Sequence, residues 1–168
     1  MTQRNLIKKV SLLALALLVI VVSLSGCGDD DGGTAEGSEV TVETSSLTKA
    51  QFIDRADSIC QQSEEKLEKV IGNFLKSFTA NPAQASVDAQ AATLVNTVMV
   101  PSYEKLIEEL RALGAPSGDE QEVSAFLTSL RESLEAGEEQ PLKFVQSREP
   151  FVEGVKLSKA YGFNVCLA

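Results

Sequence analysis

The sequence predicts an all-α protein whose folded domain is an up-and-down bundle of four kinked helices. Apolar residues recur at steps of three and four over most of residues 47–168, which is the spacing of an amphipathic helix. No alternating pattern of useful length predicts a β-strand. Proline and glycine divide the helical stretch into segments joined by short connections, as in an antiparallel bundle. We expect a signal peptide at residues 1–26 and a disordered acidic tether at residues 27–46 to precede this domain.

The N-terminus has the composition of an export signal. Arg4, Lys8 and Lys9 give the chain a positive start, and residues 10–24 then contain no charge. A helix over this apolar run reaches only about 22 Å at 1.5 Å per residue, which is short of a hydrocarbon core of roughly 30 Å. The run therefore favours the apolar region of a signal peptide over an uncleaved membrane anchor, which is the alternative.

A cysteine follows the apolar run directly. The four residues Leu24, Ser25, Gly26 and Cys27 are similar to the lipobox of bacterial lipoproteins. This resemblance implies that a dedicated peptidase cuts before Cys27 and that its thiol carries a diacylglycerol. Two acyl chains are enough for stable anchoring. We therefore expect a mature protein that is tethered by Cys27 to the extracytoplasmic face of the cell membrane without spanning it.

Residues 27–46 are predicted to form a spacer. They hold six acidic residues, no basic residue and few apolar side chains, so they lack the surface that a folded segment buries. The run from Asp29 to Gly32 invites comparison with a calcium loop. An EF-hand loop needs a glutamate at its twelfth position, however, and Val40 stands there. A solvated acidic linker is the better interpretation.

The first helix of the domain has a well-marked beginning. Thr48 and Gln51 occupy the N-cap and N3 positions of a capping box, and Leu47 and Phe52 occupy the positions of a hydrophobic staple. The helix is expected to end at Asn81-Pro82. Its predicted apolar face consists of Phe52, Ala56, Ile59, Cys60, Leu67, Val70, Ile71, Phe74, Leu75 and Phe78.

The second helix is expected to begin at Asn81, with Pro82 at its first position. Pro101 interrupts its apolar stripe, so a kink or short break is predicted around Val100. Gly114 and Pro116 then close the segment.

The last two helices are delimited by proline and glycine. Ser117 and Glu120 form a second predicted capping box, and Gly137 is predicted to end that helix. The final segment runs from about residue 141, is interrupted by Pro150, and ends at Gly162 as a C′ glycine.

Two cysteines remain once Cys27 is acylated. An even pair in an exported protein is expected to form a disulfide. Alternating helices also return the chain end, with Cys166, to the end of the bundle where Cys60 lies. The alternative is a pair of buried free thiols that pack as small apolar residues.

The domain also resembles a group of small lipoproteins common in actinobacteria and their relatives. Three stretches carry the resemblance: Phe52 with the ADSIC run at 56–60, the LRALGAP run at 110–116 followed by GDE, and the AYGF run at 160–163 followed by Cys166. The resemblance implies a secreted, lipid-anchored helical domain with one disulfide. It implies no catalytic residue.

Composition excludes several classes of function. The chain has 15 basic and 24 acidic residues and a formal charge of −9, which argues against nucleic acid as a partner. It contains no histidine, so sites that need histidine as a metal ligand or catalytic base are excluded. We predict no metal and no cofactor. The glutamate clusters around Glu64, Glu108 and Glu132 are interleaved with lysine and arginine at helical spacing, which is typical of a solvated, ion-paired face.

Three functional hypotheses remain. The first is a non-enzymatic module that binds an envelope protein or a cell-wall component. The second is a carrier of a lipid or small apolar ligand, because helices interrupted at Pro101 and Pro150 leave space between them. Met99, Tyr103 and Phe144 would line such a space, although side chains at helical spacing are more often plain core. The third is an enzyme, which requires a buried pair of carboxylates in a cleft.

Overall fold

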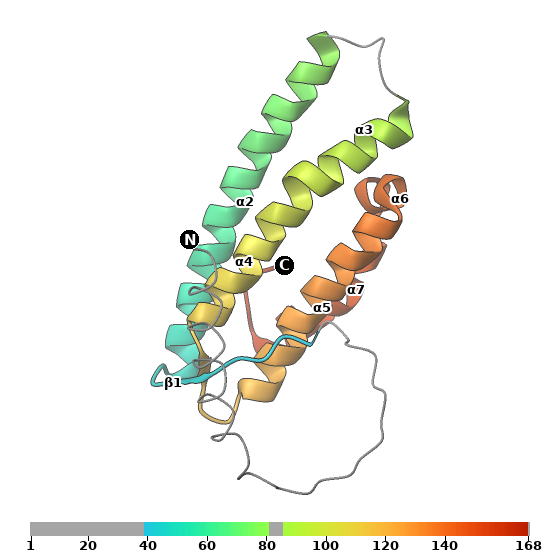
Figure 1. The fold of residues 1–168 in the computed structure, drawn as a ribbon. Helices are drawn as coiled ribbons and strands as arrows, with labels where there is room; N and C mark the ends of the chain where they lie inside the picture. The colour runs from blue at the N-terminus through green and yellow to red at the C-terminus, as the bar shows by residue number, and fades with distance from the viewer. Residues whose placement is uncertain (1–38, 81–85, 168) are drawn as a thin grey trace, which may run out of the picture. The chain divides into compact units, whose positions relative to one another are not determined.

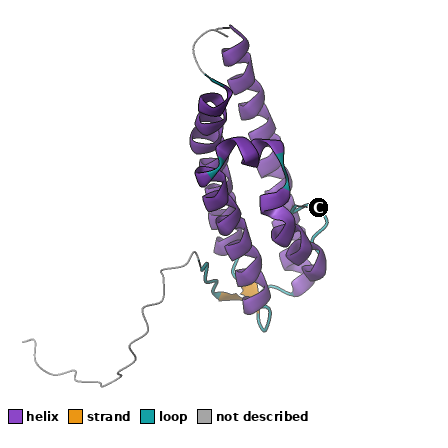
Figure 2. Cartoon of the chain, turned by 90° about the vertical axis from the view of Figure 1, so that its right-hand side faces the viewer, coloured by secondary structure: helices purple, strands orange, loops and turns teal. Residues whose placement is uncertain are grey.

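The computed structural model describes residues 39–80 and 86–167, and this part of the chain is a helical bundle, as Figures 1 and 2 show. The prediction of an all-α domain is confirmed. The signal peptide, Cys27 and the tether up to residue 38 lie outside the described residues. In chain order the elements are β1 (Thr44–Ser45), α2 (Lys49–Ala80), α3 (Val87–Leu94), the π-helical turn η1 (Val95–Met99), α4 (Val100–Ala112), β2 (Ala115–Pro116), α5 (Glu120–Glu139), α6 (Pro141–Gln146), the 3-10 turn η2 (Glu149–Phe151) and α7 (Val152–Tyr161).

Successive helical runs alternate in direction. Figure 1 shows the chain rising along α2, descending through α3 and α4, rising along α5, and descending again through α6 and α7. α4 packs against both α2 and α5, and α7 packs on α5. No helix in residues 39–80 and 86–167 combines the length and the apolar character that crossing a membrane requires.

The core lies where α2, α4 and α5 meet. Its most deeply buried large side chains are those of Phe52, Ile107, Leu110, Phe126, Leu127 and Leu130. All of them stand in the three- and four-residue pattern that predicted the apolar faces. Phe163, which follows the last helix, stacks against Phe52 and Phe126 with ring centroids 6.0 and 5.1 Å apart.

The predicted start of the first helix is confirmed. The Gln51 backbone N–H donates to Thr48 Oγ1 at 3.3 Å, and the Thr48 N–H donates to Gln51 Oε1 at 3.0 Å. Leu47 packs against the core that Phe52 enters. These reciprocal bonds satisfy backbone donors that have no partner inside the helix.

The interruption predicted at Pro101 is present as a π-helical turn. The Val100 N–H donates to the Val95 carbonyl, five residues back, and the chain stays helical through Pro101. A proline lacks the N–H that would continue the α-helical pattern and crowds the carbonyl four residues before it, so a wider turn accommodates it. This run begins at Val87, with Ser86 as its N-cap. The start predicted at Asn81-Pro82 lies outside the described residues.

Two predicted helix boundaries are wrong. The capping box at Ser117 is absent, because α5 begins at Glu120 and the Glu120 carboxylate accepts the Gly118 N–H at 2.8 Å. Gly137 does not end α5, which continues to Glu139. A Cβ at Gly137 would lie 2.7 Å from the Phe144 ring, so this glycine permits α6 to pack closely on α5. The predicted C′ glycine is confirmed, since Gly162 has a φ of 106°.

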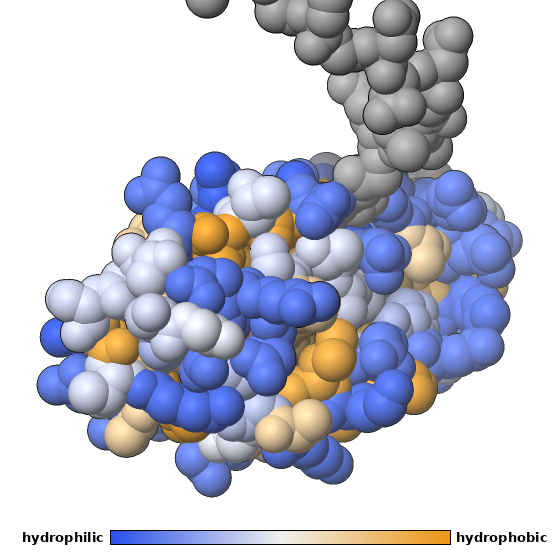
Figure 3. Space-filling view, turned by 90° about the horizontal axis from the view of Figure 1, so that it is seen from below, coloured by the Kyte–Doolittle hydropathy of each residue, from blue (hydrophilic) through white to orange (hydrophobic). Residues whose placement is uncertain are grey.

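Asp119, at the N-cap of α5, joins three elements at one end of the bundle. Its carboxylate accepts the Tyr161 hydroxyl at 2.8 Å and lies 3.7 Å from Lys49 Nζ. The same ammonium lies 3.9 Å from the centroid of the Tyr161 ring. The surface at this end, which faces the viewer in Figure 3, is mostly hydrophilic, with apolar residues in small separate patches.

The boundary predicted between tether and domain is also wrong. Residues 39–46, which we call the N-terminal arm, belong to the domain. Val40 is only 4% exposed, and its N–H donates to Thr128 Oγ1 at 2.9 Å. β1 pairs in parallel with β2, with Thr44 opposite Ala115. The valines at 40 and 42 alternate with polar residues, so one face of the arm meets the core while its backbone finds partners.

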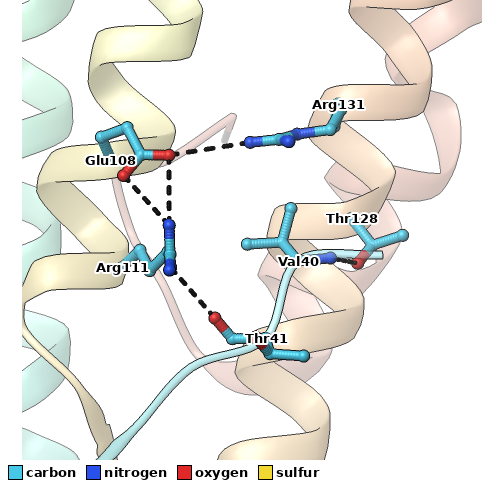
Figure 4. A network of polar contacts seen from close by, with 6 residues as sticks. All are labelled: Val40, Thr41, Glu108, Arg111, Thr128 and Arg131. Carbon is cyan, nitrogen blue, oxygen red and sulfur yellow. Dashed lines mark hydrogen bonds and ion pairs between the residues drawn. The ribbon is translucent and has the colours of Figure 1, made fainter. Parts of the chain in front are cut away.

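Polar contacts hold the middle of the arm, as Figure 4 shows. Arg111 Nε donates to the Thr41 carbonyl at 3.2 Å, and its Nη1 lies 3.3 Å from Glu108 Oε2. Glu108 also lies 3.7 Å from Arg131 of α5. The arm is therefore fastened to α4 through a side chain that is itself ion-paired.

Candidate functional site

The predicted disulfide is confirmed, and it is a structural bond. Cys60 of α2 and Cys166 are joined, with their Cα atoms 5.2 Å apart. Their exposed fractions are 2% and 1%, which leaves no access for an exchanging thiol. Cys27, the predicted acylation site, lies outside the described residues.

A groove lined in part by Leu167, the residue after the disulfide-bonded Cys166, is the candidate binding site. Its volume is about 450 Å³, within the range of roughly 300–1,000 Å³ that is typical of small-molecule sites. It lies among α2, the α3–η1–α4 run and the last three helical segments. The apolar side chains that line it are those of Ile71, Leu94, Met99, Tyr103, Phe144, Val145, Phe151, Val155 and Leu167.

The three residues that the sequence suggested for a cavity meet in this groove. Met99 ends the π-helical turn, Tyr103 lies one turn further along α4, and Phe144 comes from α6. Phe151 joins them: its ring centroid lies 5.4 Å from that of Tyr103 and 5.2 Å from that of Phe144. These aromatic contacts make one continuous apolar wall from elements far apart in sequence.

The break between α6 and α7 shapes the other side of the groove. α6 has only six residues, and Ser147 after it is extended, with φ of −138° and ψ of 144°. The Ser147 hydroxyl oxygen accepts the Glu149 N–H at 3.0 Å and starts the turn that contains Pro150. The chain thereby brings Arg148 and Phe151 to the groove instead of continuing a straight helix. The predicted interruption at Pro150 is confirmed.

Two charged residues line the groove beside Tyr103. Glu64 comes from α2, and Arg148 comes from the segment before η2. Burial raises the pKa of Glu64 above its ordinary value, the nearby Glu68 adds to the rise, and Arg148 opposes it. Burial also raises the pKa of Tyr103, with Glu64 adding to that rise and Arg148 again opposing it. The Tyr103 phenol therefore stays neutral at physiological pH.

A small cavity lies beside the disulfide, next to the groove. Its volume is about 20 Å³, which is room for about one water molecule. It shares Glu64, Tyr103 and Leu167 with the groove, and its other lining residues include Cys60 and Leu130 of the core. The groove and the small cavity are therefore neighbours that have part of one wall in common.

The glutamate cluster around Glu108 is ion-paired at the surface. Glu108 is bonded to Arg111 and Arg131, and Glu109 lies 3.7 Å from Lys105. The prediction of an ion-paired face is confirmed for these residues. Within residues 39–80 and 86–167, no three acidic or cysteine side chains gather as metal ligands would.

The two charges at the groove are not predicted by the sequence. The spacing around Glu64 is that of a solvated, ion-paired face, and nothing in the sequence distinguishes Arg148 from other surface arginines. The proline two residues after Arg148 is the available signal, because a helix break directs side chains away from the regular pattern. Comparisons of the chain with protein-family models, curated proteins and solved structures find no match.

Proposed function

We propose that this protein is a lipid-anchored, extracytoplasmic carrier that binds an apolar ligand in the groove. This was the second of the hypotheses drawn from the sequence. The single observation that carries it is the apolar wall formed by Met99, Tyr103, Phe144 and Phe151 around about 450 Å³ of space. Binding in such a site gains free energy by removing apolar ligand and protein surface from water. The proposed role is non-enzymatic.

The N-terminal arm shortens the distance that could separate such a domain from the membrane. With acylation at Cys27, only residues 27–38 separate the lipid from the arm. A chain of that length spans at most about 40 Å when fully extended. The proposed carrier would therefore work close to the membrane surface, where apolar ligands are concentrated.

The groove is tested with a neutral apolar dye, N-phenyl-1-naphthylamine. The mature chain carries Cys27→Ser, so that no acyl chain competes for the site. We expect saturable binding with one dye per chain, seen as an increase in dye fluorescence. Val155→Trp fills the groove and should abolish binding, whereas Val152→Trp, on the same helix at an exposed position outside the groove, should not.

Two outcomes contradict the carrier proposal. One is the absence of saturable dye binding to the folded protein. The other is a Val155→Trp variant that binds the dye as the unsubstituted chain does. Thermal unfolding of both tryptophan variants shows whether each is folded, so a loss of binding is not confused with a loss of structure.

The proposed anchor needs a separate experiment. A mass spectrum of the protein extracted from its own membranes should give the mass of a chain that begins at Cys27 and carries acyl groups. Cys27→Ala should leave an unprocessed or unacylated chain. An unmodified N-terminus in the unsubstituted protein would overturn the lipoprotein proposal without bearing on the groove.

A protein partner in the envelope is the second candidate function. Val70 and Leu75 near the far end of α2 are 46% and 52% exposed, and Val87 at the start of α3 is 65% exposed. A contiguous patch made of such side chains would favour contact with another surface. Crosslinking in intact cells, compared between the unsubstituted protein and a Leu75→Ser variant, tests this candidate. Capture of the same envelope protein by both, or of none, would count against it.

A further inference from the structure

Two opposite charges line the groove without neutralising each other. Glu64 lies on α2, and Arg148 directly precedes η2. Arg148 acts electrostatically on Glu64, yet no ion pair joins them in the described part of the chain. Both are partly exposed, so each retains hydrogen-bonding capacity toward a bound molecule.

The neighbouring charges do not change this arrangement. Lys143 is already paired with Glu149, with Nζ and Oε2 3.0 Å apart. Glu68, one turn beyond Glu64 on α2, adds negative charge on the same side. The lining of the groove thus combines an acidic residue on α2, a basic residue at Arg148, the Tyr103 phenol and the apolar wall.

We infer that the groove takes an amphiphile with one apolar chain and a zwitterionic head group. The cationic end of the head lies toward Glu64, and its phosphate lies toward Arg148. An arginine binds a phosphate through two parallel N–H donors, which makes it suited to that end. A purely anionic amphiphile is repelled by Glu64, and a purely cationic one is repelled by Arg148. In each case this repulsion offsets the attraction to the residue of opposite charge. This inference rests on the proposed carrier function.

The experiment displaces N-phenyl-1-naphthylamine from the mature chain with competitors that share one tetradecanoyl or tetradecyl chain. The zwitterionic competitor is a lysophosphatidylethanolamine, the anionic one is a lysophosphatidylglycerol, and the cationic one is a tetradecylammonium salt. Each is used below its critical micelle concentration. We expect the zwitterion to displace the dye at about tenfold lower concentration than either singly charged competitor.

Removing either charge should change the binding of the singly charged competitors, and the two substitutions should favour competitors of opposite charge. Arg148→Gln should weaken binding of the zwitterionic competitor about tenfold and strengthen binding of the cationic one. Glu64→Gln should weaken binding of the zwitterionic competitor and strengthen binding of the anionic one. The matched controls are Glu65→Gln and Arg55→Gln, which remove one charge of each sign from exposed positions of α2 outside the groove. These controls should leave the order of the three competitors unchanged.

The outcomes separate this inference from the function on which it rests. If the dye binds but the three competitors displace it equally, the head-group inference is overturned and the carrier function stands. If each glutamine variant changes the displacing concentration of all three competitors by the same factor, charge recognition at these residues is likewise overturned. If neither the dye nor any competitor binds the folded chain, both proposals fail together.

Discussion

The carboxylate of Asp57 holds the backbone of Cys166, the residue that is also bonded covalently to α2. Asp57 Oδ1 accepts the Cys166 N–H at 3.3 Å, and Cys60, three residues after Asp57, forms the disulfide with Cys166. The same carboxylate accepts the N–H groups of Asn164 and Val165, each at 3.0 Å. Because positions three apart are neighbours on a helix, one face of α2 holds the C-terminal segment by both kinds of bond.

This double attachment matters for the groove. Leu167, directly after Cys166, lines both the groove and the small cavity next to it. The disulfide closes a sequence separation of 106 residues, and such a link lowers the entropy of the unfolded chain by an amount worth roughly 4–5 kcal/mol. The Asp57 contacts then determine how the segment that ends in Leu167 lies against α2.

Removing the Asp57 charge should destabilise the protein. Asp57→Asn replaces an ionised acceptor of several N–H groups with a neutral amide, and we expect the free energy of unfolding to fall by about 2 kcal/mol. Urea unfolding of the oxidised chain measures this change. Asp54→Asn, at an exposed position one turn earlier on α2, is the control and should change stability by less than about 0.5 kcal/mol. Equal effects of the two substitutions would contradict the assigned role of Asp57.

Stability should also depend on pH through Asp57. Burial alone would raise its pKa, but the hydrogen bonds from Asn164, Val165 and Cys166 outweigh burial and lower the pKa below its ordinary value of 3.8. A lowered folded-state pKa adds stability that is present above the unfolded-state pKa and is lost as pH falls through the folded-state pKa. The stability difference between the unsubstituted chain and Asp57→Asn should therefore be constant near neutral pH and shrink below about pH 4. A difference that persists unchanged in strong acid would refute this.

Gly137 and Gly72 should respond in opposite ways to the same substitution. Gly137→Ala places a methyl group 2.7 Å from the Phe144 ring, and the resulting overpacking should cost about 1–3 kcal/mol. Gly72→Ala meets no atom within 4 Å and should stabilise α2 by about 0.5–1 kcal/mol. Thermal unfolding of the two variants compares them directly. A stabilised Gly137→Ala would mean that α6 does not pack on α5 at this point.

The N-terminal arm should contribute measurable stability. Val40→Ala removes two buried methyl groups, and we expect a loss of about 2 kcal/mol together with faster proteolysis of the arm. Thr41→Ala is the matched control, because Thr41 is exposed and it is its backbone carbonyl that receives the Arg111 hydrogen bond. If Val40→Ala and Thr41→Ala behave alike, the arm is not part of the core.

Two predictions from the sequence that depend only on neighbouring residues were confirmed, although the capping box predicted at Ser117 was not. The capping box of Thr48 and Gln51 and the C′ glycine at Gly162 are of this kind, since each is made by backbone within a few positions. The same reasoning failed at Gly137. Glycine commonly ends a helix, but here a ring from α6 needs its space, and contact between two helices is not visible in a local pattern.

The arm was missed for a similar reason. Its composition is that of a linker. Only the two valines at alternate positions distinguish its sequence from that of the acidic run before it. Two valines are enough because Thr128 and Arg111, both far along the chain, bind its backbone. A local pattern of residues does not contain those partners.

The sequence by itself determined the helical class and the spacing of the apolar faces, because both follow from local periodicity. It also predicted the pairing of Cys60 with Cys166, with free thiols as the alternative, and the structure shows the bond. Only the tertiary structure decided that Met99, Tyr103, Phe144 and Phe151 enclose a groove and that Glu64 and Arg148 line it. Periodicity assigns a side chain to a face of its own helix. Whether that face is closed by a neighbour or left open depends on where other helices break and turn, and those positions are set by packing across the whole domain.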